Sequence, residues 1–228
     1  MKILNINSYF LSSSLYQNLE KNLMELGISL STYVPLYNGY KPRKEIEFPL
    51  AKHVLVSECY KYNDRFIFYL KQYKIRKDIK VRYNFSNYDI LHAHSLFSNG
   101  SIAFSIYKKY RIPYVVAVRS TDINLFFKKF VYLRKSGIDI LYHASKIIFL
   151  SESYRQECIE KYVPKKIREE IFNKSVIIPN GIDDFWFDNK YNKTKTNIHN
   201  PIKIICVGND SKRKNLRTLI KACEKVIE

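Results

Sequence analysis

The chain has 228 residues, of which 39 are Lys or Arg and 21 are Asp or Glu, so its formal net charge is +18. A hydrophobic share of 46% is typical of a globular protein and excludes an intrinsically disordered one. No apolar run reaches the roughly 18–20 residues that span a bilayer, and no signal peptide follows Met1. We therefore expect a cytoplasmic protein whose positive charge favours a polyanionic or phosphate-bearing partner.

Strand and helix patterns alternate along most of the chain. The expected strands cover residues 2–7, 28–34, 52–58, 88–93, 114–118, 146–150 and 176–178. The expected helices cover residues 15–26, 64–80, 98–110, 124–132 and 152–162. Unbroken apolar runs such as YVVAV are typical of parallel strands that are buried on both faces. The alternation predicts an α/β fold with a Rossmann-like, doubly wound parallel sheet.

The composition changes near the end of the chain. The stretch DNKYNKTKTNIHNP has almost no apolar side chains, which is typical of a linker. A strand at 202–207 and a helix at 215–227 follow it, but one strand and one helix cannot bury a core alone. We expect an amino-terminal domain over residues 1–184, an interdomain linker over 185–201 and a truncated second-domain fragment over 202–228.

Polar residues follow two of the predicted strands at their carboxyl ends, where ligands bind in open α/β sheets. His92 and His94 alternate along one strand and so point to the same face. His94 is a candidate for substrate contact or proton handling; an internally hydrogen-bonded histidine, or a metal ligand, is the alternative. Arg119 and Asp122 leave the next strand together and suggest a polar floor for a ligand, although Asp122 could instead cap the following helix.

Two further places offer turn or phosphate-binding chemistry. In the segment SVIIPNGID, Asn180-Gly181 follows an apolar strand and readily forms a tight turn. Gly208 follows the strand at 202–207, and Arg213 and Lys214 open the next helix, where free backbone N–H groups and the helix dipole favour phosphate. A basic turn in solvent is the alternative for this second place.

Five segments, in this order and spacing, resemble glycosyltransferase family 4, whose members have the GT-B architecture of two Rossmann-like domains. The matching segments are YDILHAHSLFSNG, IPYVVAVRSTDIN, SKIIFLSES, SVIIPNGID and IKIICVGNDSKRKNLRTLIKA. They span about residues 86–222, whereas the amino-terminal third of the chain is similar only in topology. The resemblance implies a GT-B amino-terminal domain followed by the start of a donor domain.

The resemblance also implies roles for individual residues. In that family the amino-terminal domain receives the acceptor, the other domain binds a nucleotide-sugar donor, and transfer usually retains the anomeric configuration without a metal or cofactor. Acceptor-side catalytic roles are implied for His94, Arg119 and Asp122. Donor-binding roles are implied for Asn180, Gly181, Gly208, Arg213 and Lys214. The implied partners are a nucleotide sugar and a glycan or lipid-linked acceptor.

The chain departs from the family pattern in several places. Ser12-Ser13-Ser14 stands where a Gly-Gly loop is common, Arg119 replaces a histidine, and Asn209 replaces an arginine. The paired glutamates of the family would lie beyond Glu228. We therefore expect a hexosyltransferase-type enzyme of cell-envelope polysaccharide synthesis, capsule or lipopolysaccharide, that is inactive as this chain alone. The alternative is a non-catalytic subunit of a split glycosyltransferase that recruits acceptor or membrane.

Basic aromatic segments give the charge a second interpretation. Residues 62–83 and 124–135 combine aromatic side chains with many Lys and Arg, as basic amphipathic helices on anionic membranes do. The sequence therefore makes an anionic membrane surface a candidate partner and the protein a candidate for peripheral attachment. Alternatively, these aromatic side chains pack on the sheet and the cations face water. No nucleic-acid-binding signature accompanies the charge, so no nucleic acid is expected.

Overall fold

The structure is a computed structural model that describes residues 1–42, 52–190, 205–208 and 215–227. The chain divides into two units, Met1–Trp186 and Phe187–Glu228, which are described separately. The described sheet and both clusters of buried apolar side chains lie within the first unit.

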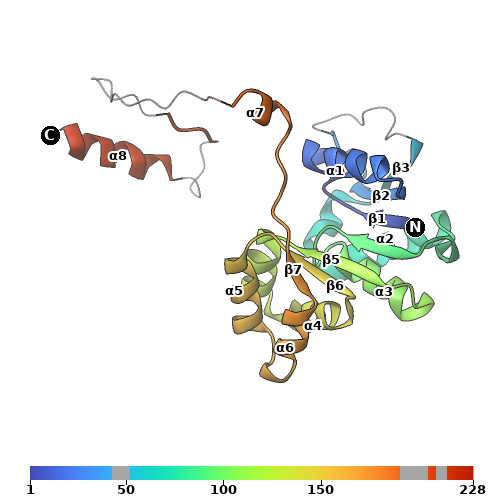
Figure 1. Ribbon diagram of the computed structural model, residues 1–228. Helices are drawn as coiled ribbons and strands as arrows, with labels where there is room; N and C mark the ends of the chain where they lie inside the picture. The colour runs from blue at the N-terminus through green and yellow to red at the C-terminus, as the bar shows by residue number, and fades with distance from the viewer. Residues whose placement is uncertain (43–51, 191–204, 209–214, 228) are drawn as a thin grey trace. The chain divides into compact units, whose positions relative to one another are not determined.

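The first unit is built on a seven-stranded parallel sheet with the order β3-β2-β1-β4-β5-β6-β7 (Figure 1). The strands are β1 (Lys2–Ile6), β2 (Ser29–Tyr37), β3 (Val54–Tyr60), β4 (Ile90–Ala93), β5 (Tyr114–Val118), β6 (Lys146–Phe149) and β7 (Ser175–Ile177). Strand order reverses at β1, which lies between β2 and β4, so the predicted doubly wound, Rossmann-like fold is confirmed. Ligands bind such sheets at the carboxyl ends of the strands near this reversal.

Helices connect the strands and cover the sheet. The α-helices of this unit, with the short α7 at its end, are α1 (Ser14–Glu25), α2 (Phe68–Arg82), α3 (Gly100–Tyr110), α4 (Arg134–His143), α5 (Glu152–Tyr162), α6 (Arg168–Asn173) and α7 (Phe185–Asp188). The shorter turns include η1 (Phe10–Ser12), η3 (Tyr62–Phe66), η4 (Phe85–Asn87), a π-helix η5 (Asp122–Phe127), η6 (Val131–Leu133) and η7 (Lys165–Ile167). Helices α2, α3 and α4 contact one another in turn and form one layer. The helix predicted at 124–132 is replaced by η5 and η6, and α4 and α6 were not predicted.

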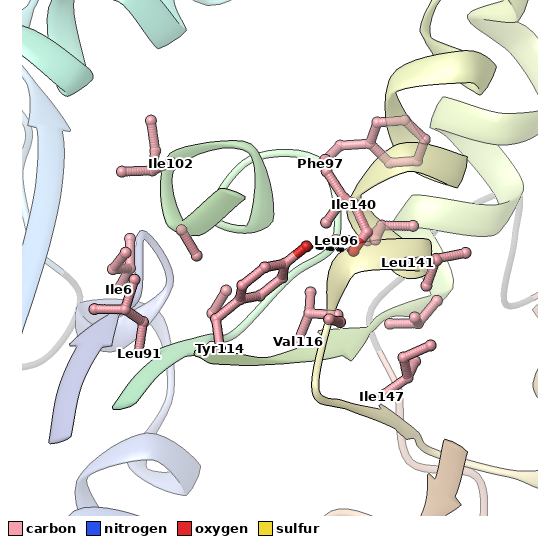
Figure 2. Packing of buried hydrophobic residues seen from close by; sticks show 14 of the residues in the cluster. Ile6, Leu91, Leu96, Phe97, Ile102, Tyr114, Val116, Ile140, Leu141 and Ile147 are labelled. Carbon is pink, nitrogen blue, oxygen red and sulfur yellow. Dashed lines mark hydrogen bonds between the residues drawn. The ribbon is translucent and has the colours of Figure 1, made fainter. Parts of the chain in front are cut away.

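The main core lies where β4 and β5 meet α3 and α4. Leu91, Tyr114 and Val116 project from the strands toward Ile102 of α3 and Ile140 of α4 (Figure 2). Tyr114 is fully buried, and its hydroxyl donates a hydrogen bond to the carbonyl oxygen of Ile140. The core therefore contains a large aromatic ring whose polar atom is satisfied, as buried hydroxyl groups require.

Helix α2 packs with a different face from the one that the sequence predicted. Spacing over residues 64–80 predicted a common side for Phe66, Tyr69, Leu70 and Tyr73. In the structure the helix begins at Phe68, and its buried residues are Gln72, Ile75 and Ile79. The predicted side is exposed, with 73% of Phe66 and 61% of Tyr73 accessible to solvent. Apolar residues occur all around this helix, so their spacing does not define the buried face.

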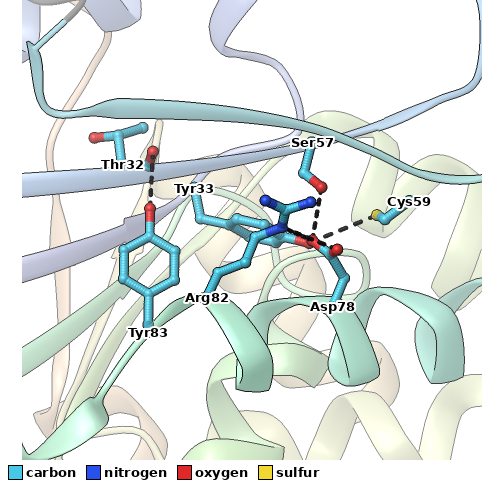
Figure 3. A network of polar contacts seen from close by, with 7 residues as sticks. All are labelled: Thr32, Tyr33, Ser57, Cys59, Asp78, Arg82 and Tyr83. Carbon is cyan, nitrogen blue, oxygen red and sulfur yellow. Dashed lines mark hydrogen bonds and ion pairs between the residues drawn. The ribbon is translucent and has the colours of Figure 1, made fainter.

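A polar network fixes α2 against β2 and β3. The Asp78 carboxylate accepts hydrogen bonds from the Tyr33 hydroxyl and the Ser57 hydroxyl, both at 2.7 Å (Figure 3). Arg82, one turn later on α2, pairs with the same carboxylate at 2.8 Å. These bonds lower the pKa of Asp78 although its partial burial opposes them, so the carboxylate stays charged and paired at neutral pH.

Strand β2 continues past Pro35, where the sequence predicted its end. Pairing of β1 with β2 stops at Ile6 and Tyr33, two residues before Pro35. On its other side β2 pairs with β3, from Thr32 with Val54 as far as Tyr37 with Tyr60. Proline lacks an N–H group and is tolerated in a strand where one side has no neighbouring strand to accept from it.

The second unit is described at residues 187–190, 205–208 and 215–227. Helix α8 (Leu216–Ile227) forms as predicted, although one residue shorter at its start. Residues 205–207, the described part of the predicted strand, are not in a strand, because a strand needs a hydrogen-bonded neighbour. Across the described part of both units, no helix has the length and apolar character needed to cross a membrane.

Candidate functional site

A cavity of about 670 Å³ lies within the first unit beside the amino-terminal end of α1. Its polar end is formed by His92, His94, Arg119 and Asn180 with Ser13, which stands before α1. These residues come from β4 and from segments that follow β1, β4, β5 and β7, so the polar end of the cavity lies at the carboxyl edge of the sheet. This is the edge at which the sequence placed its acceptor-side candidates. The rest of the cavity extends along the sheet face to Met1, Ile3 and Ile90.

Arg119 connects three parts of this polar end. Its Nε donates to the carbonyl oxygen of His94 at 3.1 Å, and its Nη1 donates to Oδ1 of Asn180 at 2.9 Å. The guanidinium also lies over the Tyr16 ring, 5.6 Å from its centroid. Within the described residues no Asp or Glu oxygen lies within ion-pair distance of this guanidinium. A half-buried cation without a carboxylate partner is suited to binding an anionic group of a ligand.

His92 and His94 form a pair of neutral imidazoles beside that cation. Their ring centroids are 4.0 Å apart, and the His94 ring packs edge-on against Tyr16. Burial, with the Arg119 charge as a weaker cause, lowers the pKa of His92 to about 4. Burial also lowers the pKa of His94, together with the charges of His92 and Arg119. Neither ring nitrogen of His94 has a hydrogen-bond partner among the described residues. The neutral His94 ring therefore keeps one donor and one acceptor nitrogen unused within the described residues.

Asp122 lies behind the cavity and is absent from its lining. Its buried carboxylate accepts backbone N–H groups of Leu96 at 3.0 Å, Phe97 at 3.1 Å and Arg119 at 2.8 Å. Burial raises its pKa to about 6, against the opposing effect of these hydrogen bonds and of the Arg119 charge. Asp122 therefore ties the segment after β4 to the segment after β5, and it positions the backbone of Arg119. The sequence offered Asp122 as a cap of the helix that follows it. In the structure its carboxylate bonds to the segments after β4 and β5 instead.

The donor-side candidates fall in three different places. Asn180 and Gly181 follow β7 and line the cavity, and a Cβ atom at Gly181 would meet nothing within 4 Å. Gly208 is exposed and belongs to the second unit. Arg213 and Lys214 lie outside the described residues. The structure thus brings His94, Arg119, Asn180 and Gly181 to one cavity, with Asp122 directly behind it.

The sequence missed the contribution of α1. Leu15, Leu19 and Leu23 were predicted at helical spacing, and the structure places them along the apolar wall of the cavity. The buried residues of α1 are Tyr16, Gln17 and Glu20, and Glu20 is held by Asn5 and Thr32. Tyr16 and Glu20 also lie at helical spacing, so the buried face of α1 was visible in the sequence. It was missed because hydrophobic periodicity does not predict that a glutamate faces the sheet.

The metal alternative for His92 and His94 requires a third ligand. Among the described residues no group of three or more His, Cys, Asp or Glu side chains is placed to hold a metal ion. The same part of the chain contains four free cysteines, of which Cys158 is buried and Cys206 exposed. The lining of the cavity offers hydrogen-bonding groups, the Arg119 cation and the Asp183 carboxylate for ligand recognition.

The fold and cavity define an α/β domain of the kind that binds ligands at its strand ends, and comparison with known proteins gives its family. Residues 14–184 match the model of Glycosyltransferase Family 4. This match covers most of the chain, and the chain belongs to that family. The resemblance read from the sequence is thereby confirmed.

Two known proteins illustrate the relationship. The chain is 26% identical over 162 residues to an uncharacterized glycosyltransferase of Methanocaldococcus jannaschii, a match that covers 64% of this chain and 41% of that protein. A solved structure of sucrose-phosphate synthase from Thermosynechococcus elongatus superposes with a TM-score of 0.56 at 15% identity. That match covers 80% of this chain and 91% of the solved chain, and it confirms the fold expected for a GT-B amino-terminal domain.

Substitution Asp122→Asn tests the role of the buried carboxylate. An amide keeps the shape but turns an NH₂ group toward backbone N–H donors, so we expect the free energy of unfolding to fall by about 2 kcal/mol at pH 7. Urea unfolding measures this change, with Asp184→Asn at an exposed site as the matched control. An Asp122→Asn variant as stable as the wild type would contradict the assigned role.

The pH dependence of stability tests the histidine pair. His92 has a pKa of about 4 in the folded chain, and an unfolded histidine titrates near 6.5, so the unfolded state binds the extra proton between these values. The contribution of His92 to stability is present above pH 6.5 and is lost as the pH falls toward 4. Asp122 acts in the opposite direction, because its raised pKa stabilises the folded state as the pH falls through 6.

The free energy of unfolding of the wild type should fall between pH 7 and pH 4.5 as His92 is protonated in the unfolded state. We expect His92→Asn to make this fall about 1–3 kcal/mol smaller. Urea unfolding at both pH values measures it, and His143→Asn, at an exposed histidine, is the control. A folded-state NMR titration of His92 centred near 6.5 would show that the assignment is wrong.

Proposed function

We propose that this chain is the acceptor-binding part of a glycosyltransferase that moves a sugar, hexosyl in type, from a nucleotide-sugar donor to a glycan or lipid-linked acceptor. Family membership supports the class of reaction. The single observation that supports the acceptor assignment is the cavity that joins Arg119, His94 and Asn180 at the carboxyl edge of the sheet. The chain spans 41% of the length of the curated relative that it matches, so the activity of the whole protein belongs to the proposal.

Arg119 is assigned to an anionic group on the acceptor, such as a phosphate ester. Its guanidinium is fixed by the His94 carbonyl, by Asn180 and by the Tyr16 ring, which leaves donor capacity directed into the cavity. Charge-assisted hydrogen bonds of a guanidinium to phosphate oxygens are among the strongest in proteins. A cell-envelope acceptor, in capsule or lipopolysaccharide synthesis, that carries a phosphate on a sugar or on a lipid would satisfy this site.

His94 is assigned to a hydroxyl group of the acceptor. Its lowered pKa keeps the ring neutral at physiological pH and makes it a weak base, but leaves one donor and one acceptor nitrogen. In the proposed reaction the acceptor oxygen bonds to the anomeric carbon while the bond from that carbon to the diphosphate breaks. The departing diphosphate takes the electron pair and is the natural recipient of the hydroxyl proton. We expect the configuration at the anomeric carbon to be retained.

The donor side is assigned to the segment after β7 and to the second unit. Asn180 and Gly181 line the cavity, and Gly208, Arg213 and Lys214 follow in the chain. Lys214, with Arg213 as a weaker candidate, would stabilise the negative charge that develops on the leaving diphosphate. Donor and acceptor must be brought together for transfer, so we expect the chain alone to bind acceptor without transferring sugar.

Ligand binding to the chain tests the acceptor assignment. We expect hexose phosphates to bind more tightly than the unphosphorylated hexoses, and Arg119→Gln to weaken that binding at least tenfold because one charged hydrogen-bonding partner is lost. Calorimetry and ligand-observed NMR measure the affinities, and Lys165→Gln, at an exposed lysine on η7, is the control.

Two results would contradict the proposal. Equal loss of affinity in the Arg119 and Lys165 variants would mean that phosphate binds through general charge. Transfer of radiolabelled sugar from a panel of nucleotide sugars by the 228-residue chain alone would contradict the assigned division between acceptor and donor parts.

A further inference from the structure

An exposed aromatic surface lies outside the cavity, on η3, the first turns of α2, and η6. Its six largest exposed apolar side chains are Tyr62, Phe66, Ile67, Tyr69, Tyr73 and Tyr132, each about half or more accessible to solvent. We call these residues the aromatic surface. The alternative in which the aromatic side chains of this region pack on the sheet is therefore wrong for the five aromatic residues of this set.

The aromatic surface includes ring contacts between distant parts of the chain. The rings of Tyr62 and Phe66 are in contact, and the ring of Tyr69 contacts that of Tyr132 with centroids 6.4 Å apart. Phe68 of α2 also contacts Phe126 of η5, 5.9 Å between centroids. The two segments thus present one apolar patch, and contiguous apolar patches on a protein surface are typical of interaction sites.

Positive charge surrounds the aromatic surface. Between them, residues 61–83 and 123–136 contain twelve Lys and Arg and two carboxylates, which is more than half of the net charge of the chain. Both carboxylates are already paired, Asp64 with Lys74 at 2.6 Å and Asp78 with Arg82 at 2.8 Å. Arg65 lies over the Tyr62 ring, and Lys128 and Lys129 are exposed just before Tyr132. The negative charges of these segments are therefore neutralised, and exposed cations such as Lys128 and Lys129 remain to meet anions.

We propose that the aromatic surface and its surrounding cations bind an anionic phospholipid bilayer. Tyrosine and tryptophan side chains favour the boundary between headgroups and acyl chains, because one end of the ring system is apolar and the other is polar. Lys and Arg around them meet the negative headgroups, and the two contributions add. A protein partner would need a complementary acidic surface, whereas a bilayer supplies both chemistries at once.

The position of the surface fits the proposed acceptor function. η3 begins two residues after β3 ends, and η6 is reached from the end of β5, so both leave the carboxyl edge of the sheet. The polar end of the cavity, with Arg119 and His94, lies at that same edge. This inference depends on the proposed function only for the source of the acceptor: a lipid-linked acceptor would lie near the cavity when the chain is on the membrane.

Vesicle flotation of the 228-residue chain tests the proposal without sugar or nucleotide, so its result is independent of the glycosyltransferase assignment. We expect binding to vesicles of 70% phosphatidylcholine and 30% phosphatidylserine at least tenfold tighter than to phosphatidylcholine alone. High salt reduces the electrostatic part of this affinity.

Two pairs of matched variants locate the site. Phe66→Ser with Tyr132→Ser should weaken binding at least tenfold, whereas Leu26→Ser with Phe172→Ser, at exposed apolar residues outside these segments, should not. Lys128→Gln with Lys129→Gln should weaken binding about tenfold. The control pair Lys165→Gln with Lys166→Gln, at two adjacent exposed lysines on η7, should have a much smaller effect. Thermal unfolding confirms that each variant is folded.

Several results would overturn the proposal. Equal binding to neutral and anionic vesicles would show that the cations do not contribute to membrane binding. Equal losses in the test and control variants would show that general charge or hydrophobicity is responsible. Failure to float, combined with tight binding of a single-stranded RNA that the Phe66 and Tyr132 substitutions abolish, would assign the surface to nucleic acid instead.

Discussion

The candidate site depends on one buried carboxylate. Asp122 accepts three backbone N–H groups from the segments that leave β4 and β5, and these segments carry His94 and Arg119. Burying a carboxylate is costly, as its raised pKa shows, and the three hydrogen bonds offset that cost. These hydrogen bonds hold the segments after β4 and β5 in a fixed position relative to each other. Asp122 is therefore a positioning residue in this account, although the sequence suggested a direct role.

The position of Arg119 determines the electrostatics of the cavity. The Arg119 guanidinium contacts a carbonyl, an amide and an aromatic ring, and the Asp122 carboxylate behind the cavity bonds to its backbone N–H and not to the guanidinium. The Arg119 charge also contributes to lowering the pKa values of His92 and His94, so the site places one guanidinium beside two neutral imidazoles. Such a site favours an anionic ligand that also carries hydroxyl groups, which is the chemistry of a phosphorylated sugar.

Much of the fold was predictable because the parallel strands are short, apolar and regularly spaced. The sheet, α1, α3 and α5 follow from that pattern, and His94 and Arg119 follow from the rule that ligands meet strand ends. The buried face of α2 was not predictable, because apolar residues surround that helix and the tertiary contacts select Ile75 and Ile79. The position of Asp122 also required the structure, since its partners Leu96 and Phe97 are about 25 residues away in the chain.

We expect anions to bind in the cavity beside Arg119 and not on the basic surface in general. Backbone and side-chain NMR of the isotopically labelled chain, titrated with a hexose phosphate, distinguishes these two locations. We predict the largest and earliest shift changes at Arg119, Asn180 and the ring of His94, with saturation at a single affinity. Changes spread over the lysines of α2 and over Lys128 and Lys129, which follow η5, with Arg119 unaffected, would contradict this assignment.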